Sequence, residues 1–167
     1  FSWTNNDPYL RGSIVAYPFK RLEASYQYTD VNNALYSNIS SFSGSQSYKD
    51  KAFDIKLLLK EESIIFPAIA MGIRDIAGSG IFSSEYIVAS KMYRNIDFTF
   101  GIGWGVLNKN SIANPLSEIS SRFEERTYDL DTRGGEFDSG KYFSGDAGLF
   151  AGIELFLPNA NGSRIKI

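Results

Sequence analysis

The chain of 167 residues contains no histidine and no cysteine. It therefore has no imidazole base, no thiol nucleophile, no disulfide, and none of the ligand sets typical of zinc or haem. Seventeen Lys and Arg against nineteen Asp and Glu give a net charge of -2, which argues against a groove that binds nucleic acid by neutralising phosphates. We accordingly expect no metal site, no cofactor and no nucleic-acid partner.

Long apolar runs are also missing. The longest, residues 64–73, is far shorter than the roughly 20 residues that a membrane-spanning helix needs, and it contains Pro67 and Gly72. A β-strand crosses a bilayer with only about 9–11 residues, so the sequence excludes a spanning helix but not a membrane barrel. The chain starts at Phe1 without a basic or apolar leader pattern, and we see no signal peptide in it.

What the sequence does have is many aromatic residues (15%), fifteen glycines and a polar/apolar period of two. The clearest example is residues 96–106. Its even positions carry large apolar side chains and its odd positions carry Asp97, Thr99 and three glycines. Similar alternation occurs in 21–29, 53–60 and 149–157. This period predicts β-strands rather than helices.

We predict an all-β chain of eight strands, with one short helix in the longest loop. Asn114 is suited to cap this helix and Pro115 to begin it, with Leu116, Ile119 and Phe123 on one face. The stretch 31–46 is polar and is expected to be a surface loop. The predicted strands are 11–17, 21–30, 52–61, 67–76, 83–93, 96–107, 143–157 and 163–167.

The lengths of the connections favour one arrangement of these strands. If neighbours are antiparallel, the connections at one end have two to five residues, whereas those at the other end have 21, 6 and 35. Short turns at one end and long loops at the other are typical of an antiparallel up-and-down transmembrane β-barrel. A soluble sandwich, which turns its apolar face inward, stays open as an alternative.

In a barrel, the two faces of each strand predict two sets of side chains. Aromatic residues near strand ends, among them Tyr86, are candidates for a girdle at the membrane interface. The lipid-facing candidates are Phe98, Phe100, Ile102 and Trp104. The lumen-lining candidates are Arg21, Glu23, Asp54, Lys56, Arg74, Glu85, Lys91, Asp97 and Glu154. These charges either form salt bridges that fill a narrow barrel or line a track for a hydrophilic polymer.

Adjacent carboxylates raise the question of hydrolase chemistry. A glycosidase needs two carboxylates about 5–10 Å apart across a cleft. Glu61 and Glu62 are expected in a turn, Glu124 and Glu125 at the end of the loop helix, and Asp129 with Asp131 lacks the length of a calcium loop. A structural role is favoured for all three pairs, and we predict no enzyme.

Six segments, in the same order along the chain, resemble the YjbH (GfcD-like) family of outer-membrane β-barrel proteins from exopolysaccharide and capsule operons. They are YTDV at 28–31, SYKDKAFDIK at 47–56, GIRDIAGSGIFSSEYIVASK at 72–91, DFTFGIGWG at 97–105, NPLSEISSRFEER at 114–126 and GLFAGIE at 148–154.

The resemblance implies a location in the bacterial outer membrane and a role in polysaccharide export or surface assembly, as a conduit or a docking scaffold. The implied partners are outer-membrane lipid, a polysaccharide chain and other proteins of the export operon. The family offers no catalytic residue to carry over. Its members are much longer, so residues 1–167 are expected to be one segment of the N-terminal barrel region. A soluble carbohydrate-binding β-domain and, less favoured, a polysaccharide-modifying hydrolase remain alternatives.

Overall fold

The computed structural model describes residues 2–76, 82–126, 139–158 and 164–166. In these residues nine strands form one sheet, in which every strand pairs antiparallel with the next along the chain. The strands are β1 (Ser2–Asn6), β2 (Tyr9–Phe19), β3 (Leu22–Leu35), β4 (Ser47–Lys60), β5 (Ala68–Arg74), β6 (Ser84–Tyr93), β7 (Ile96–Gly105), β8 (Ala147–Pro158) and β9 (Arg164–Lys166).

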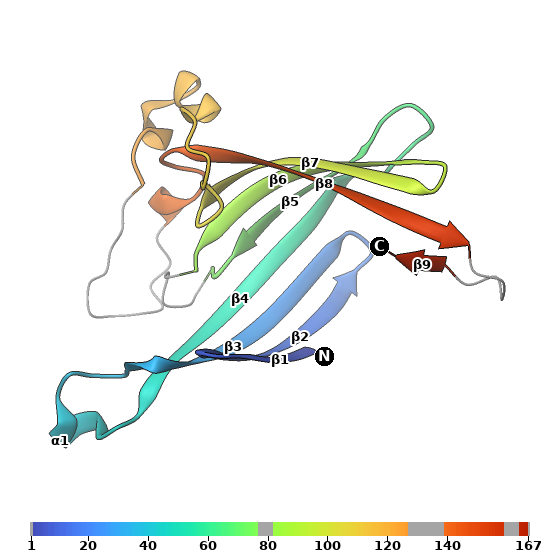
Figure 1. The fold of residues 1–167 in the computed structure, drawn as a ribbon. Coiled ribbons are helices and arrows are strands. Elements are labelled where there is room, and N and C mark those ends of the chain that lie inside the picture. The colour runs from blue at the N-terminus through green and yellow to red at the C-terminus, as the bar shows by residue number, and fades with distance from the viewer. Residues whose placement is uncertain (1, 77–81, 127–138, 159–163, 167) are drawn as a thin grey trace.

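The sheet is curled into a half-barrel, with β1 and β9 at its two ends (Figure 1). The prediction of an all-β, up-and-down antiparallel fold is therefore confirmed. All eight predicted strands are present. The sequence missed β1, because Ser2–Asn6 is short and polar and shows no alternation. The predicted strands 21–30 and 52–61 are also too short, because β3 and β4 both continue into the predicted connection 31–51.

The two faces of the sheet have opposite polarity. One face carries the cross-strand pairs Ala24–Ile55 and Tyr26–Phe53, and the other carries Gln27–Ala52 and Thr29–Asp50. The first face is largely exposed, whereas Gln27, Thr29, Asp50 and Ala52 are buried. A soluble sheet with one solvated face normally shows the reverse pattern.

Contacts across the curl show which face is inside. The ring of Tyr9 on β2 meets the ring of Phe82, which precedes β6, edge-on with centroids 6.4 Å apart. The guanidinium of Arg11 lies 5.8 Å from the centre of the same Phe82 ring. Because β2 and β6 are not neighbours in the sheet, these contacts span the hollow. We call the polar side that faces the hollow the concave face, and the apolar side the convex face.

The described parts of the connection between β7 and β8, residues 106–126 and 139–146, cover one end of the sheet. They contain the 3-10 helices η1 (Pro115–Glu118), η2 (Ser121–Phe123) and η3 (Ser139–Lys141). As predicted, Asn114 caps the first turn, accepting a hydrogen bond from the Leu116 N–H at 3.0 Å. The predicted single helix is divided, because Ser120 caps a second turn, and Ile119 is exposed rather than packed beside Phe123.

The connection between β3 and β4 also differs from expectation, because it forms one helical turn, α1 (Ser40–Ser43). Among the helices that the structure describes, none is long and apolar enough to cross a membrane.

Candidate functional site

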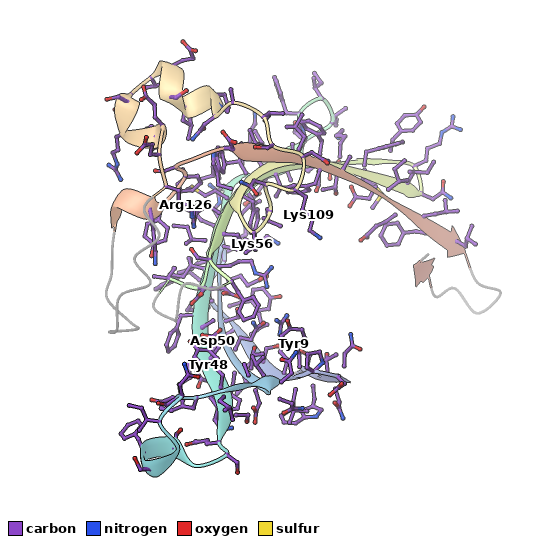
Figure 2. The ribbon with its side chains drawn as sticks, turned by 60° about the vertical axis from the view of Figure 1, so that its left-hand side comes forward. Tyr9, Tyr48, Asp50, Lys56, Lys109 and Arg126 are labelled. Atoms are coloured by element: carbon purple, nitrogen blue, oxygen red, sulfur yellow. The ribbon has the colours of Figure 1, made fainter. Side chains whose placement is uncertain are left out.

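A polar pocket lies in the middle of the concave face. Its volume is about 180 Å³, and four neighbouring strands, β3 to β6, contribute its lining. Figure 2 shows the curl from the side, with β1–β3 extending from the lower part of β4, β6–β8 from its upper part, and Lys56 on β4 between them. The side chains that line the pocket are those of Glu23, Ser25, Asp54, Lys56, Arg74 and Tyr86, with part of Ile55.

The register of the sheet brings these side chains together. Glu23 lies opposite Lys56, and Ser25 lies opposite Asp54. Gly72 then separates Lys56 on one side from Tyr86 on the other. A Cβ atom at Gly72 would collide with the Tyr86 ring, so the absence of a side chain there is what lets Tyr86 reach the pocket.

Asp54 is held by two hydrogen bonds. Its Oδ2 accepts from the Ser25 hydroxyl at 3.1 Å, and its Oδ1 accepts from the backbone N–H of Asp75 at 3.0 Å. Asp75 adopts a φ of 59°, a left-handed conformation that Asp tolerates better than most residues. Asp54 therefore fixes the end of β5 against β4.

The other charged side chains of the pocket are not held by hydrogen bonds of this kind. Glu23 and Lys56 lie opposite each other, but no ion pair within 4.0 Å joins them. In the part of the chain that the structure describes, Glu23, Lys56 and Arg74 make no hydrogen bond and no ion pair. All three are partly buried, and their polar atoms face the hollow.

Four of the nine charged residues expected in a lumen, namely Glu23, Asp54, Lys56 and Arg74, line this pocket. Asp97 and Glu154 also lie on the concave face, directly opposite each other on β7 and β8. Arg21 instead lies in the turn before β3, where its Nη2 donates to Glu61 at 3.2 Å.

The expectation that Glu85 and Lys91 lie on the polar face is wrong. The two-residue turn Arg94–Asn95 fixes the register of β6 on β7, so Lys91 lies opposite Phe98 and Glu85 opposite Trp104. Both charges therefore share the apolar face. Counting residues back from this tight hairpin would have placed them correctly, because the register of a hairpin follows from its turn length.

Each of these two charged side chains has an oppositely charged partner nearby. The Lys91 ammonium donates to Glu62 Oε1 at 2.8 Å and to the Ser63 carbonyl at 2.6 Å, in the turn between β4 and β5. Glu85 is fully buried and receives two hydrogen bonds from Arg126, at 2.7 and 3.0 Å, and one from the Phe143 N–H at 2.9 Å. The β7–β8 connection is thus fastened to the start of β6.

The four candidates for lipid contact share the convex face, opposite Ile153, Ala151, Leu149 and Ala147 of β8. Phe98 and Phe100 are exposed and Ile102 is half-exposed. The expectation for Trp104 is wrong, because it is only 1% exposed, with the ring of Phe143 edge-on at 5.2 Å. The folded β7–β8 connection covers it.

Sequence reasoning missed three residues of these sites. Tyr86 was expected in an interfacial girdle, yet it lies on the concave face. Ser25 is uncharged, and alternation alone gives no reason to single it out as a site residue. Arg126 is one of several charged residues in 122–126, and the sequence alone does not show that its partner is Glu85.

Of the three adjacent carboxylate pairs, two lie in described residues, and neither lines the polar pocket. Glu61 and Glu62 are paired with cations, and Glu124 and Glu125 are exposed. Asp129 and Asp131 lie outside the described residues. Within the described part of the chain, no three acidic side chains gather as a metal site would require.

Comparison with known proteins places the chain in a family. The profile of the YjbH family, described as "Exopolysaccharide biosynthesis protein YbjH", matches residues 1–165. The chain is 43% identical over 158 residues to the Escherichia coli K12 protein named "Uncharacterized lipoprotein YjbH". This alignment covers 94% of the chain but 22% of that relative, so the chain spans about a fifth of its length. No solved structure is similar to it. With the family profile matched over nearly its whole length, the chain belongs to the YjbH family.

Proposed function

We propose that the chain is part of an outer-membrane β-barrel that serves the export or surface assembly of an exopolysaccharide, as a conduit or docking scaffold without chemistry of its own. The observation that carries the proposal is the inverted polarity of the curled sheet. Large apolar side chains such as Phe100 and Ile153 are 56% and 68% exposed on the convex face, while the polar side chains of Gln27, Thr29 and Asp50 are buried on the concave face. Lipid outside and a polar interior require this arrangement.

The lengths of three strands agree with the proposal, whereas β5 has 7 residues and β3 and β4 have 14 each. β2 has 11 residues and β6 and β7 have 10 each, within the roughly 9–11 that a tilted strand needs to cross the hydrocarbon layer. The tight turns between β2 and β3 and between β6 and β7 lie at one end of the sheet. The longer connections lie at the opposite end, which would be outside the cell.

A barrel in lipid leaves no strand edge unpaired, because no water is available to satisfy the backbone. The proposal therefore requires further strands beside β1 and β9. The relative from Escherichia coli is several times longer than the region matched, and the additional length of such a protein is one source of these strands. A second copy of the sheet is the other.

The link to polysaccharide rests on the family. Its description names exopolysaccharide biosynthesis, and the Escherichia coli relative is named a lipoprotein, which agrees with a place at a membrane. Of the two mechanical roles, the docking role draws support from the β7–β8 connection. The described parts of that connection are fastened by the buried Glu85–Arg126 pair and would present a surface outside the barrel.

The test is a topology measurement on the full-length protein reconstituted in bilayers. Single cysteines replace Phe100 and Ile153 on the convex face, and Gln27 and Gly152 on the concave face, and each carries a spin label. We expect labels at Phe100 and Ile153 to be relaxed by oxygen, which enters lipid, and those at Gln27 and Gly152 by a water-soluble nickel complex. If nickel relaxes the convex labels in intact vesicles, the chain is not a membrane barrel and the soluble carbohydrate-binding domain takes its place.

A further inference from the structure

Lys56 and Arg74 are unusual among the cations of this chain. A partly buried cation normally has an anionic or aromatic partner, because removing a charge from water is unfavourable unless something compensates it. In the described ranges, the other partly buried cations all have such a partner. These pairs are Lys49 with Asp30, Lys91 with Glu62, Arg126 with Glu85, Arg11 with Phe82, and Lys141 with Tyr142.

The two exceptions line the same pocket. Lys56 lies opposite Gly72 on β5, and Arg74 is two residues further along that strand, so both side chains rise from the same part of the concave face. Asp54 also lines the pocket, but both of its oxygens already accept hydrogen bonds from Ser25 and from the Asp75 backbone. The pocket thus offers two cationic donors without a committed acceptor.

We propose that this pocket is a binding subsite for a sugar residue that carries a carboxylate, with Lys56 and Arg74 binding the carboxylate and Glu23 accepting hydrogen bonds from the sugar hydroxyls. This inference rests on the proposed function, because it assigns the concave face to the polysaccharide. It adds the chemical class of the polymer: an acidic one.

Glu23 is what distinguishes a sugar acid from a simple anion. Its carboxylate lies opposite Lys56 and repels a doubly charged group such as phosphate. The hydroxyls of a sugar, in contrast, can donate hydrogen bonds to it, and a carboxylate is a strong acceptor. Tyr86 adds an aromatic ring with a polar tip beside these charges, a combination suited to the mixed surface of a sugar.

The volume sets the size of the ligand. The pocket holds about 180 Å³, roughly the space of six water molecules, which suits one sugar ring rather than an oligosaccharide. A polymer would therefore occupy it one residue at a time. Weak binding of single units is what passage requires, since a chain that binds tightly does not move on.

The test measures binding of sodium glucuronate to the full-length protein in lipid nanodiscs, by saturation-transfer NMR. Glucose, which lacks the carboxylate, and inorganic phosphate, which lacks the sugar, are the comparison probes. Phosphate has no proton signal of its own, so its binding is measured by its displacement of glucuronate. We expect glucuronate to bind about tenfold more tightly than either. We expect Lys56→Gln and Arg74→Gln each to weaken glucuronate binding about tenfold. Lys20→Gln, which removes an exposed cation from the turn between β2 and β3, is the matched control and should change nothing.

A second variant guards against loss of folding. Glu23→Gln keeps the shape of the side chain and removes the repulsion, so we expect phosphate to bind more tightly while glucuronate is retained. Equal binding of glucose and glucuronate, or no effect of Lys56→Gln and Arg74→Gln in folded protein, overturns the assignment. If phosphate binds to the unmodified protein as tightly as glucuronate, the assignment of a sugar ligand is overturned and the pocket is a general anion site. The spin-label topology is independent of all three results, so the subsite can fail while the membrane barrel stands.

Discussion

Glu85 and Arg126 are 41 residues apart in sequence and form an ion pair with two hydrogen bonds, at 2.7 and 3.0 Å, that is almost completely withdrawn from water. Their side chains are 0% and 5% exposed. The pair joins the start of β6 to the β7–β8 connection. Arg126 also donates to the Ser83 hydroxyl at 2.8 Å, so its guanidinium is held from two directions.

Breaking this pair should destabilise the β7–β8 connection. Arg126→Gln leaves the Glu85 carboxylate buried without its counter-charge, a change that typically costs about 3–5 kcal/mol. We expect the described parts of the connection, residues 106–126 and 139–146, to become more sensitive to trypsin in the reconstituted protein, and the unfolding midpoint in urea to fall. Arg21→Gln removes a partner of the exposed pair with Glu61 and should cost less than about 1 kcal/mol. Equal effects of the two variants would contradict a fastening role for Glu85.

The glycines of the concave face predict a second pair of variants. Phe150 lies directly opposite Gly101, and a Cβ atom at Gly101 would collide with its ring. Gly101→Ala should therefore overpack this position and cost about 1–3 kcal/mol. Gly152→Ala, one strand away and with open space around its Cβ position, should be neutral in the same urea titration. Phe150→Leu should restore much of the stability lost in Gly101→Ala, and a failure to do so would mean that the collision is not the cause.

The turn between β4 and β5 should give a pH-dependent contribution to stability. A hydrogen bond from Lys91 lowers the pKa of Glu62, and one from the Met92 N–H adds to it, while partial desolvation opposes both. A carboxyl whose pKa is lowered on folding stabilises the fold above its unfolded pKa, about 4.3 for Glu. That contribution decreases as the pH falls below this value and is gone below the lowered pKa. Over this pH range the urea unfolding midpoint of the wild-type protein should therefore fall relative to that of Glu62→Gln, which lacks the ionisable group. Parallel pH curves for the two proteins would refute the linkage.

Two adjacent residues of β8 test which face contacts lipid. Ile153 lies on the convex face opposite Phe98, and Gly152 lies on the concave face opposite Thr99. An arginine on the lipid side of a barrel near the middle of the bilayer costs about 2–4 kcal/mol. We expect Ile153→Arg to reduce assembly in the membrane, measured as the heat-modifiable folded band on cold electrophoresis. Gly152→Arg should assemble normally, because its side chain faces the polar hollow. The opposite order would reverse the assignment of the faces.

The sequence was most informative where a pattern is local. Alternation along residues 96–106 predicted β7, and the same period located β3, β4 and β8. The cap at Asn114 was also visible, because a capping side chain and its target lie two residues apart. Interactions between residues close in sequence can therefore be predicted from the sequence alone.

The errors concern contacts between distant parts of the chain. Trp104 has the parity of a lipid-facing residue, and only the folded β7–β8 connection, through Phe143, removes it from the surface. Glu85 was predicted on the polar face, whereas the hairpin register places it opposite Trp104 on the apolar face. Its partner Arg126 makes that position favourable, and no periodicity reveals a partner 41 residues away.

The open ends of the sheet have a consequence for how the chain behaves outside a bilayer. The outer rims of β1 and β9 present backbone donors and acceptors that no neighbouring strand satisfies in the described sheet. The exposed apolar side chains of the convex face also favour association with other apolar surfaces. Expressed alone in water, residues 1–167 should therefore assemble edge to edge into insoluble material, and chaperones that shield unpaired strands should be needed until the rims are closed.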